Sequence, residues 1–150
     1  MTRADDMRTA FQALSEIAII GQLADAALRQ VLPEELSVAG FGVLNHFTRL
    51  GLESESPTKL ARAFQVTKGA MTYTLQQLEA LKYVHIEDNP ADARAKVVRV
   101  TKAGARARED AIRRVDPGMR ALVEAIGAKE FERAMPFLVK VRRILDAARG

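Results

Sequence analysis

The sequence predicts a mainly α-helical protein that carries one small β-hairpin. Three observations indicate this class. Apolar residues recur at helical spacing over most of the chain, the spacing changes to alternation only between residues 84 and 100, and turn-forming residues stand where each pattern stops. A length of 150 residues suits one domain with a sizeable core. We therefore expect a single domain over residues 1–150, with a central segment of about residues 37–101 between flanking helices.

A long amphipathic helix is expected over about residues 4–32. Its apolar positions are Met7, Phe11, Leu14, Ala18, Leu23, Ala27 and Val31. Ile17, Ile19 and Ile20 widen this face beyond what one partner helix would cover. Two interpretations stay open, because the face could cover the core of its own chain or be buried by a second subunit.

The next helix is expected between Ser37 and Gly51, because serine caps helix starts and glycine ends helices. Its core-facing residues are Phe41, Leu44, Phe47 and Leu50. His46 lies on the same helix without other metal-ligating residues at helical spacing. A metal site needs several convergent donors, so we expect neither a metal nor a cofactor.

A helix-turn-helix is predicted over residues 56–81. Ser56 and Pro57 start a short helix, and after a three-residue turn Thr67 can cap a second helix that continues to about Leu81. The inner stripe of this second helix contains Met71, Leu75 and Leu78, and its outer face contains Gly69, Thr72, Tyr73, Gln76 and Gln77.

The polar outer face of the second helix suits the major groove of DNA, where hydroxyls and amides can contact base edges. Lys68 is suited to a phosphate or a guanine, and Gln76 to an adenine. Thr72 or Tyr73 could meet a thymine methyl group or a phosphate. Polar helix faces are commonly just solvated, and the DNA interpretation depends on the surrounding elements.

A β-hairpin is predicted directly after this helix. The alternating apolar positions are Val84, Ile86, Val98 and Val100, and residues 88–92 supply the turn. The tip and the return strand carry Arg94, Lys96 and Arg99. A helix-turn-helix followed by a hairpin is a winged helix, with the hairpin as its wing.

Two more helices are expected, over residues 101–126 and from there to about residue 148. Pro117 should kink or divide the first of them, since proline removes one helical hydrogen bond, and Pro136 lies within the second. The arginines of the first helix are interpreted as a solvated face paired with neighbouring acids; they are Arg106, Arg108, Arg113 and Arg114. Contact of Arg106 with a phosphate is the alternative.

Composition narrows the function. A formal net charge of +4 admits a polyanionic partner without requiring one. The absence of cysteine excludes disulfides and thiol-based sensing. No uninterrupted apolar stretch of the length that a bilayer requires occurs, and the N-terminus does not resemble a signal peptide, so we expect a cytoplasmic protein with no membrane partner. No pattern typical of a nucleophile, a phosphate loop or a metal centre is present, and we expect no enzyme activity.

Four motifs occur in a fixed order: Pro57-Thr58-Lys59-Leu60-Ala61, a helix from Thr67 that ends Leu78-Glu79, Asp92-x-Arg94, and Val100-Thr101-x-x-Gly104. This ordered set resembles the MarR family of bacterial transcription regulators. The resemblance implies a homodimer, with residues 4–32 and 102–148 at the dimer interface. It also implies repression through a pseudo-palindromic operator in double-stranded DNA, and release of that DNA by a small aromatic or phenolic effector.

The resemblance also assigns residues by position. Those expected in the major groove are Thr67, Lys68, Thr72, Tyr73 and Gln76. Arg94 is expected to contact DNA from the wing, with Asp92 supporting it, and the basic Lys59, Arg62 and Lys96 complete the DNA-binding candidates. The effector pocket is expected between the dimer helices and the winged helix, lined by Phe11, His46 and Phe47.

The chain departs from the family pattern near the wing. Lys82 stands where the family often has glycine, and Ile86, Glu87 and Ala93 stand where it often has arginine. Glu87 places a negative charge in a strand that leads to the tip of the wing. The alternative is therefore a winged-helix module that binds another protein and has lost specific DNA binding.

Overall fold

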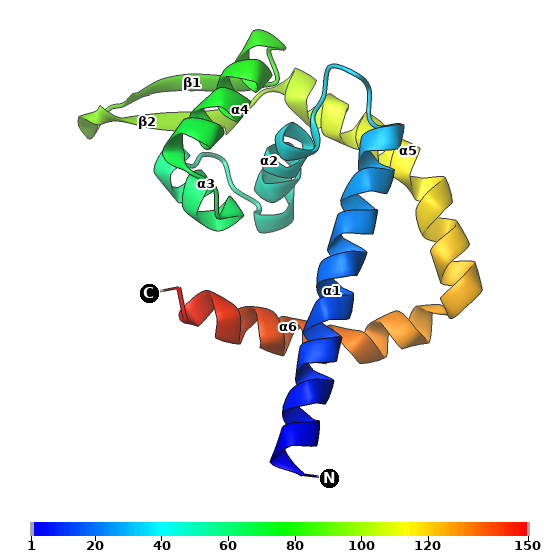
Figure 1. Ribbon diagram of the computed structural model, residues 1–150. Helices are drawn as coiled ribbons and strands as arrows, with labels where there is room; N and C mark the ends of the chain where they lie inside the picture. The colour runs from blue at the N-terminus through cyan, green and yellow to red at the C-terminus, as the bar shows by residue number, and fades with distance from the viewer. Residues whose placement is uncertain (1, 150) are drawn as a thin grey trace. The chain divides into compact units, whose positions relative to one another are not determined.

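The computed structural model describes residues 2–149, and it confirms the mainly α-helical class with one hairpin (Figure 1). The elements in chain order are α1 (Arg3–Val31), α2 (Val38–Leu50), α3 (Pro57–Phe64), α4 (Lys68–Ala80), β1 (Val84–Asn89), β2 (Asp92–Val100), α5 (Lys102–Ile126) and α6 (Ala128–Ala147). The chain divides into two compact units, the first ending at Arg114 and the second beginning at Val115.

The core of the first unit is formed by the winged helix together with the start of α5. Its most deeply buried large side chains are Val43, Leu44, Leu60, Leu75, Leu78 and Val98. These come from α2, α3, α4 and β2, so each helix of the winged helix and its return strand contribute an apolar face to one core. Burial of these faces supplies the main driving force for this arrangement.

Side-chain caps begin α2, α3 and α4 at the predicted residues. Ser37, Ser56 and Thr67 each accept a hydrogen bond from the backbone N–H three residues later, at 2.9, 3.2 and 3.1 Å. Gly51 ends α2 with φ of 62°, in the left-handed region that glycine adopts without strain. The predicted starts of these three helices are confirmed.

The hairpin is antiparallel, with Ile86 opposite Val98 and a bulge between Asp88 and Asn89. Val98 also pairs with Glu55, just before α3, through backbone hydrogen bonds of 2.9 and 3.1 Å in both directions. The sequence did not predict this bridge. It holds the base of the wing against the helix-turn-helix.

The end of α4, the base of the wing and the start of α5 are closely packed. Lys82 has φ of 63°, which explains why glycine suits this position. The Thr101 hydroxyl donates to the Lys82 carbonyl at 2.7 Å and accepts from the Gly104 N–H at 3.0 Å. A Cβ atom on Gly104 would lie 2.0 Å from the carbonyl oxygen of Tyr83. The Val100-Thr101-x-x-Gly104 motif therefore allows the start of α5 to pack closely against the base of the wing.

Helix α5 continues through Pro117, so of the two predicted outcomes, a kink or a division, division did not occur. Proline removes one backbone hydrogen bond of the helix. The remaining hydrogen bonds on both sides of Pro117 maintain the helix as far as Ile126. The border between the two compact units nevertheless falls close to it, between Arg114 and Val115.

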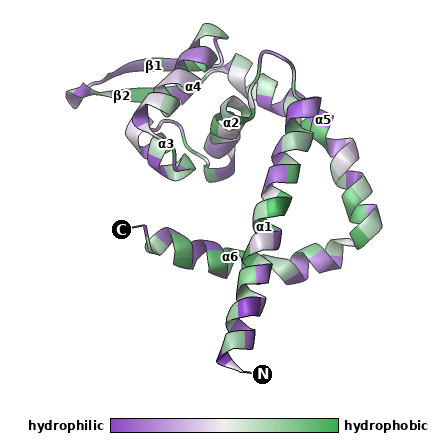
Figure 2. Cartoon of the chain, viewed as in Figure 1, coloured by the Kyte–Doolittle hydropathy of each residue, from purple (hydrophilic) through white to green (hydrophobic). Residues whose placement is uncertain are grey.

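The flanking helices leave apolar side chains exposed. Neither α1 nor α6 contains a buried residue, and Figure 2 shows apolar positions recurring along both. Phe11 is 73% exposed and Ile20 is 59% exposed, whereas Leu28, near the end of α1, packs on the core. The described residues of the first unit thus leave this face of α1 uncovered. None of the helices within residues 2–149 has the length and apolar character needed to cross a lipid bilayer.

Candidate nucleic-acid interface

Helix α4 presents the two faces that its sequence predicts. Met71, Leu75 and Leu78 are buried in the core, whereas Thr72 and Gln76 point away from it. Tyr73 is 63% exposed on the same outer side. A helix that follows the turn of a helix-turn-helix and exposes hydroxyls and amides has the composition of a base-reading helix.

The start of α4 carries the basic residue closest to the turn of the helix-turn-helix. Thr67 uses its side-chain oxygen to accept from the Ala70 N–H, and its own hydroxyl hydrogen stays available to an acceptor. Lys68 is exposed and makes no ion pair with any residue in the range 2–149. The helix N-terminus adds partial positive charge beside both, which favours a phosphate there.

Sequence reasoning missed a contact on the outer face of α4. The Gln77 side-chain amide donates to the Tyr73 hydroxyl oxygen at 2.9 Å. Residues four apart on a helix face each other, so the spacing itself was a usable signal. The contact holds the Tyr73 ring along the helix, beside Gln76.

Two basic residues of α3 lie next to this helix. Lys59 is highly exposed and stands 3.9 Å from the Glu55 carboxylate, a surface pair of small energetic value. Arg62 lies on the exposed side of α3. The exposed positions of both side chains suit contact with a polyanion.

Arg94 lies near the tip of the wing. Asp92 accepts a hydrogen bond from the backbone N–H of Arg94 at 3.0 Å, so it fixes the turn and leaves the guanidinium exposed. Within residues 2–149 the Arg94 side chain has no ion-pair partner. Its full charge is therefore available to a phosphate.

The other basic residues of the wing are paired across the strands. Lys96 pairs with Asp88, and Arg99 donates to Glu87 at 2.9 Å. His85 also stands 3.7 Å from Glu87. Over residues 84–100 three acidic and three basic side chains cancel, so the wing carries no formal net charge with histidine neutral. Lys96, expected to bind DNA, is thus already paired within the wing.

A further contact fixes the wing relative to α4. The Glu79 carboxylate, near the end of α4, accepts from the backbone N–H of Ile86 in β1 at 3.1 Å. Together with the bridge between Glu55 and Val98, it holds the hairpin through both of its strands. The base of the wing is therefore fixed to the helix-turn-helix.

Two of the three residues expected to line an effector pocket are neighbours in α2, where His46 and Phe47 lie edge to face with ring centroids 6.5 Å apart. Phe11 is exposed on α1 and Phe47 is buried in the core. His46 packs on Phe64, with ring centroids 5.3 Å apart, beside a shallow hollow that neither Phe11 nor Phe47 lines. Burial, helped by the charge of Arg49, lowers the pKa of His46 below its ordinary value of 6.5.

Helix α5 is tied to α2 by a contact that the sequence did not indicate. The Arg108 guanidinium donates two hydrogen bonds to the Asn45 side-chain oxygen, at 3.1 and 3.2 Å. Arg108 also pairs with Glu109, as expected, yet its side chain is mostly buried instead of solvated. Among residues 2–149, no three histidine or acidic side chains gather as metal ligands would.

Comparisons with known proteins agree with this geometry. Residues 34–95 match the sequence model of the MarR family. Wild-type MarR from E. coli in its apo form is 27% identical, with a TM-score of 0.72 over 85% of this chain and 93% of its own. A mutant of the same protein complexed with operator DNA is 24% identical, with a TM-score of 0.72 over 94% of this chain and 99% of its own.

A third solved structure is that of BpsR from Bordetella bronchiseptica, a protein whose DNA binding is regulated by 6-hydroxynicotinic acid. It is 20% identical, with a TM-score of 0.73 over 87% of this chain and 98% of its own. No curated protein sequence matches the chain. The family match covers the helix-turn-helix and most of the wing, and the fold extends the likeness to the flanking helices. Over its winged-helix segment the chain is thus similar to the MarR family, and its fold is that of MarR from E. coli.

Proposed function

We propose that the protein binds double-stranded DNA by placing α4 in the major groove and Arg94 against the flanking backbone. The observation that carries this proposal is the outer face of α4, where Thr72, Tyr73 and Gln76 are exposed beside an exposed Lys68. The hydrogen-bonding groups on this one helix face supply base contacts, and the basic residues supply phosphate contacts. The operator complex of the E. coli relative supports the same use of the fold.

In this proposal the protein binds DNA as a homodimer. Each unit exposes apolar side chains that a second copy can bury, among them Phe11 and Ile20 on α1 of the first unit and Phe131 in the second unit. A two-fold dimer would present two copies of α4 about one helical turn, roughly 34 Å, apart. The matching operator is an inverted repeat.

The regulatory outcome is repression by occlusion of a promoter, relieved by a small aromatic effector. Regulation of BpsR by 6-hydroxynicotinic acid supports this part of the proposal. An effector acts by binding more tightly to the dimer whose α4 spacing does not fit the operator. Its effect on DNA affinity cannot exceed its difference in affinity for the two forms.

A second candidate function is favoured by the neutral wing. Glu87 and Asp88 form ion pairs with Arg99 and Lys96, so these two basic side chains are less available to phosphates. A winged helix of this kind could bind a protein partner instead of DNA. The two functions differ in salt dependence, since each phosphate that a basic residue neutralises steepens the decrease of DNA affinity with salt.

The deciding experiment is selection of bound sequences from random duplex DNA with the purified full chain at two salt concentrations. We expect recovery of an inverted repeat whose half-sites lie about one turn apart, and weaker binding at the higher salt. Failure to enrich any sequence would contradict the DNA proposal and favour the protein-binding function. A single unrepeated half-site, or a monomer in sedimentation analysis, would contradict the dimer.

A further inference from the structure

The outer face of α4 carries a pair of side chains whose hydrogen bond has a defined direction. The Nε2 atom of Gln77 donates to the hydroxyl oxygen of Tyr73 at 2.9 Å. Both side chains are exposed. The two residues are four positions apart, so their side chains are neighbours on the helix surface. The pair is therefore available to a molecule that approaches this face of α4.

The bond leaves the hydroxyl hydrogen of Tyr73 available for donation. A tyrosine hydroxyl has one hydrogen to donate, and its oxygen accepts. The oxygen already accepts from Gln77, and no residue in the range 2–149 accepts the hydrogen. The sequence of α4 contains a single acid, Glu79, whose carboxylate accepts from the backbone N–H of Ile86. Tyr73 thus presents a donor to an external partner.

The two residues occupy different turns of α4. Tyr73 lies in the second turn after the start of the helix at Lys68, and Gln77 lies one turn closer to the C-terminal end. In a helix-turn-helix, residues near the start of the second helix contact base edges. Tyr73 is therefore placed to read a base, and Gln77 is placed to orient Tyr73.

We propose that Gln77 is a positioning residue that keeps the Tyr73 hydroxyl as a donor, so that Tyr73 selects a purine at one position of each half-site. This inference rests on the proposed DNA binding. In the major groove adenine and guanine both present N7 as an acceptor, and neither pyrimidine has this atom. One donor directed at N7 therefore separates purines from pyrimidines but does not separate adenine from guanine.

The direction of the bond between Gln77 and Tyr73 decides this selection. A side chain at position 77 that only accepts would take the hydroxyl hydrogen of Tyr73. The oxygen of Tyr73 would then present lone pairs to the DNA, and these repel the lone pair of N7. A change at position 77 can thus remove the purine preference without removing Tyr73.

The pair itself is tested by NMR on the full chain without DNA. We expect a nuclear Overhauser contact between the side-chain N–H of Gln77 and the ring of Tyr73, and a shift of the Gln77 side-chain signal in Tyr73→Phe. Tyr83→Phe is the matched control, because it removes the hydroxyl of the other tyrosine, which lies outside α4. Lack of the contact, or equal shifts in the two variants, would overturn the pairing.

The contact with N7 is tested on the operator selected from random duplex DNA. We expect one position in each half-site to accept adenine and guanine alike. Replacement of that purine by its 7-deaza analogue should weaken binding roughly three- to tenfold, the effect of one lost hydrogen bond. Tyr73→Phe should bind both duplexes equally, whereas Tyr83→Phe should still distinguish them. If Tyr73→Phe lost equal affinity on operator and random DNA, the hydroxyl would contact a phosphate and base reading would be overturned.

Two substitutions at Gln77 test the direction of the bond. Gln77→Glu accepts from the Tyr73 hydroxyl and should remove the purine preference, whereas Gln77→Lys still donates and should keep it. The measured quantity is the ratio of affinities for duplexes with a purine and a pyrimidine at this position, because a change of net charge affects both duplexes equally. Preference kept in Gln77→Glu and lost in Gln77→Lys would overturn the proposed direction, and equal ratios in both variants would overturn the positioning role.

Failure of this inference is distinguishable from failure of the proposed function. A chain that enriches no DNA sequence would contradict both, whatever the NMR contact between Gln77 and Tyr73. A chain that enriches an inverted repeat without a purine-specific position sensitive to Tyr73→Phe would contradict only the selection by Tyr73.

Discussion

Helix α4 and the wing both face the proposed DNA surface, but they use their polar side chains in opposite ways. On α4 the outward hydroxyls and amides are exposed, and Lys68 has no ion-pair partner within residues 2–149. On the wing, Arg99 and Lys96 are held by Glu87 and Asp88 of the facing strand. Sequence selectivity is therefore expected from α4, while the electrostatic contribution of the wing comes mainly from Arg94.

The base of the wing is held by packed backbone, whereas the charged side chains of its strands form exposed pairs. Its position depends on close backbone packing at Gly104, whereas the pairs that Lys96 and Arg99 make along the strands involve exposed charges. Four substitutions test these differences.

Gly104→Ala should have the largest effect. The added methyl group would lie 2.0 Å from the backbone oxygen of Tyr83, and backbone cannot move aside as a flexible side chain can. We expect the free energy of unfolding to fall by about 3 kcal/mol or more, measured by chemical denaturation. Gly118→Ala is the matched control, because this residue of the same helix has no heavy atom within 4 Å of an added Cβ. Equal stability of the two variants would show that the junction is not tightly packed.

Gln76→Ala should act on sequence selectivity. Removal of a bidentate base contact should cost about 1 to 3 kcal/mol on the selected operator and relax the choice at one base pair, with little change on random DNA. Binding is measured on the operator, on its single-base variants and on random duplexes. Gln30→Ala, at an exposed glutamine of α1, serves as the control. An equal decrease of affinity on specific and random DNA would exclude Gln76 from base readout.

Arg94→Ala should act on all DNA alike. Without the guanidinium, one phosphate per wing is no longer neutralised, so affinity should fall by about 1 kcal/mol and the salt slope should decrease by about 0.9 for each such phosphate. The slope is obtained from binding isotherms at several salt concentrations. If slope and affinity both stayed at the values of the unsubstituted protein, the wing would not touch phosphate.

Glu87→Gln should have the smallest effect and the opposite sign. It releases Arg99, so DNA affinity should rise by less than about 1 kcal/mol and the salt slope should steepen. Glu34→Gln changes the net charge equally but lies in the segment that joins α1 to α2. An identical gain in both variants would mean that the overall charge, and not release of Arg99, was responsible.

Local patterns predicted most of the fold. The caps at Ser37, Ser56 and Thr67 and the buried stripe of α4 depend only on neighbouring residues, and the structure confirms them. The bridge between Glu55 and Val98 joins positions far apart in the chain, and no local periodicity reports it. The continuation of α5 through Pro117 likewise depends on the helical hydrogen bonds before and after the proline, which the local sequence around Pro117 does not report.

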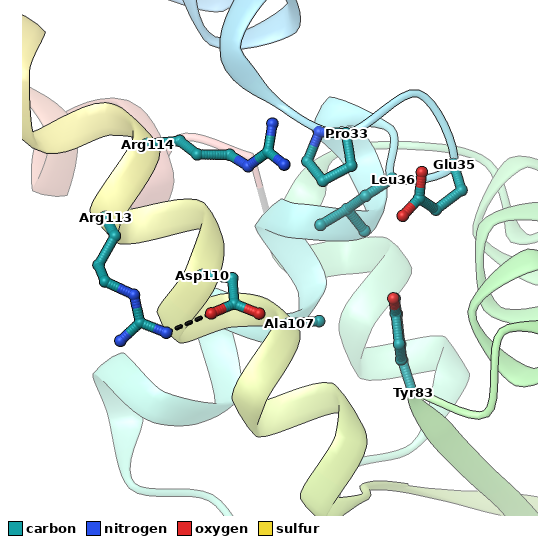
Figure 3. Close-up of a pocket in the computed structure, with 8 residues that line it drawn as sticks. All are labelled: Pro33, Glu35, Leu36, Tyr83, Ala107, Asp110, Arg113 and Arg114. Atoms are coloured by element: carbon teal, nitrogen blue, oxygen red, sulfur yellow. Dashed lines mark hydrogen bonds and ion pairs between the residues drawn. The ribbon is translucent and has the colours of Figure 1, made fainter.

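The candidate site was predicted less completely. The exposure of Thr72, Tyr73 and Gln76 followed from helical spacing, but pairing of Lys96 with Asp88 depends on strand register, which was not predicted. A further pocket, shown in Figure 3, is lined by the segment that joins α1 to α2, by Tyr83 and by the first half of α5, and no sequence motif could reveal it because these segments are separate in the chain. A pocket lined by Phe11, His46 and Phe47 would likewise need residues from separate segments, and sequence patterns do not report such proximity.

The pairing of Val98 also has a consequence for the motion of the wing. Its N–H is bonded to Glu55 and lies in a fully buried residue, so its hydrogen can exchange with solvent only when the bridge opens. The bulge between Asp88 and Asn89 interrupts the ladder near the tip, where amides have fewer protecting contacts. We therefore expect slow amide exchange at the base of the hairpin and faster exchange at its tip, so that mainly the tip would lose conformational entropy when Arg94 meets DNA.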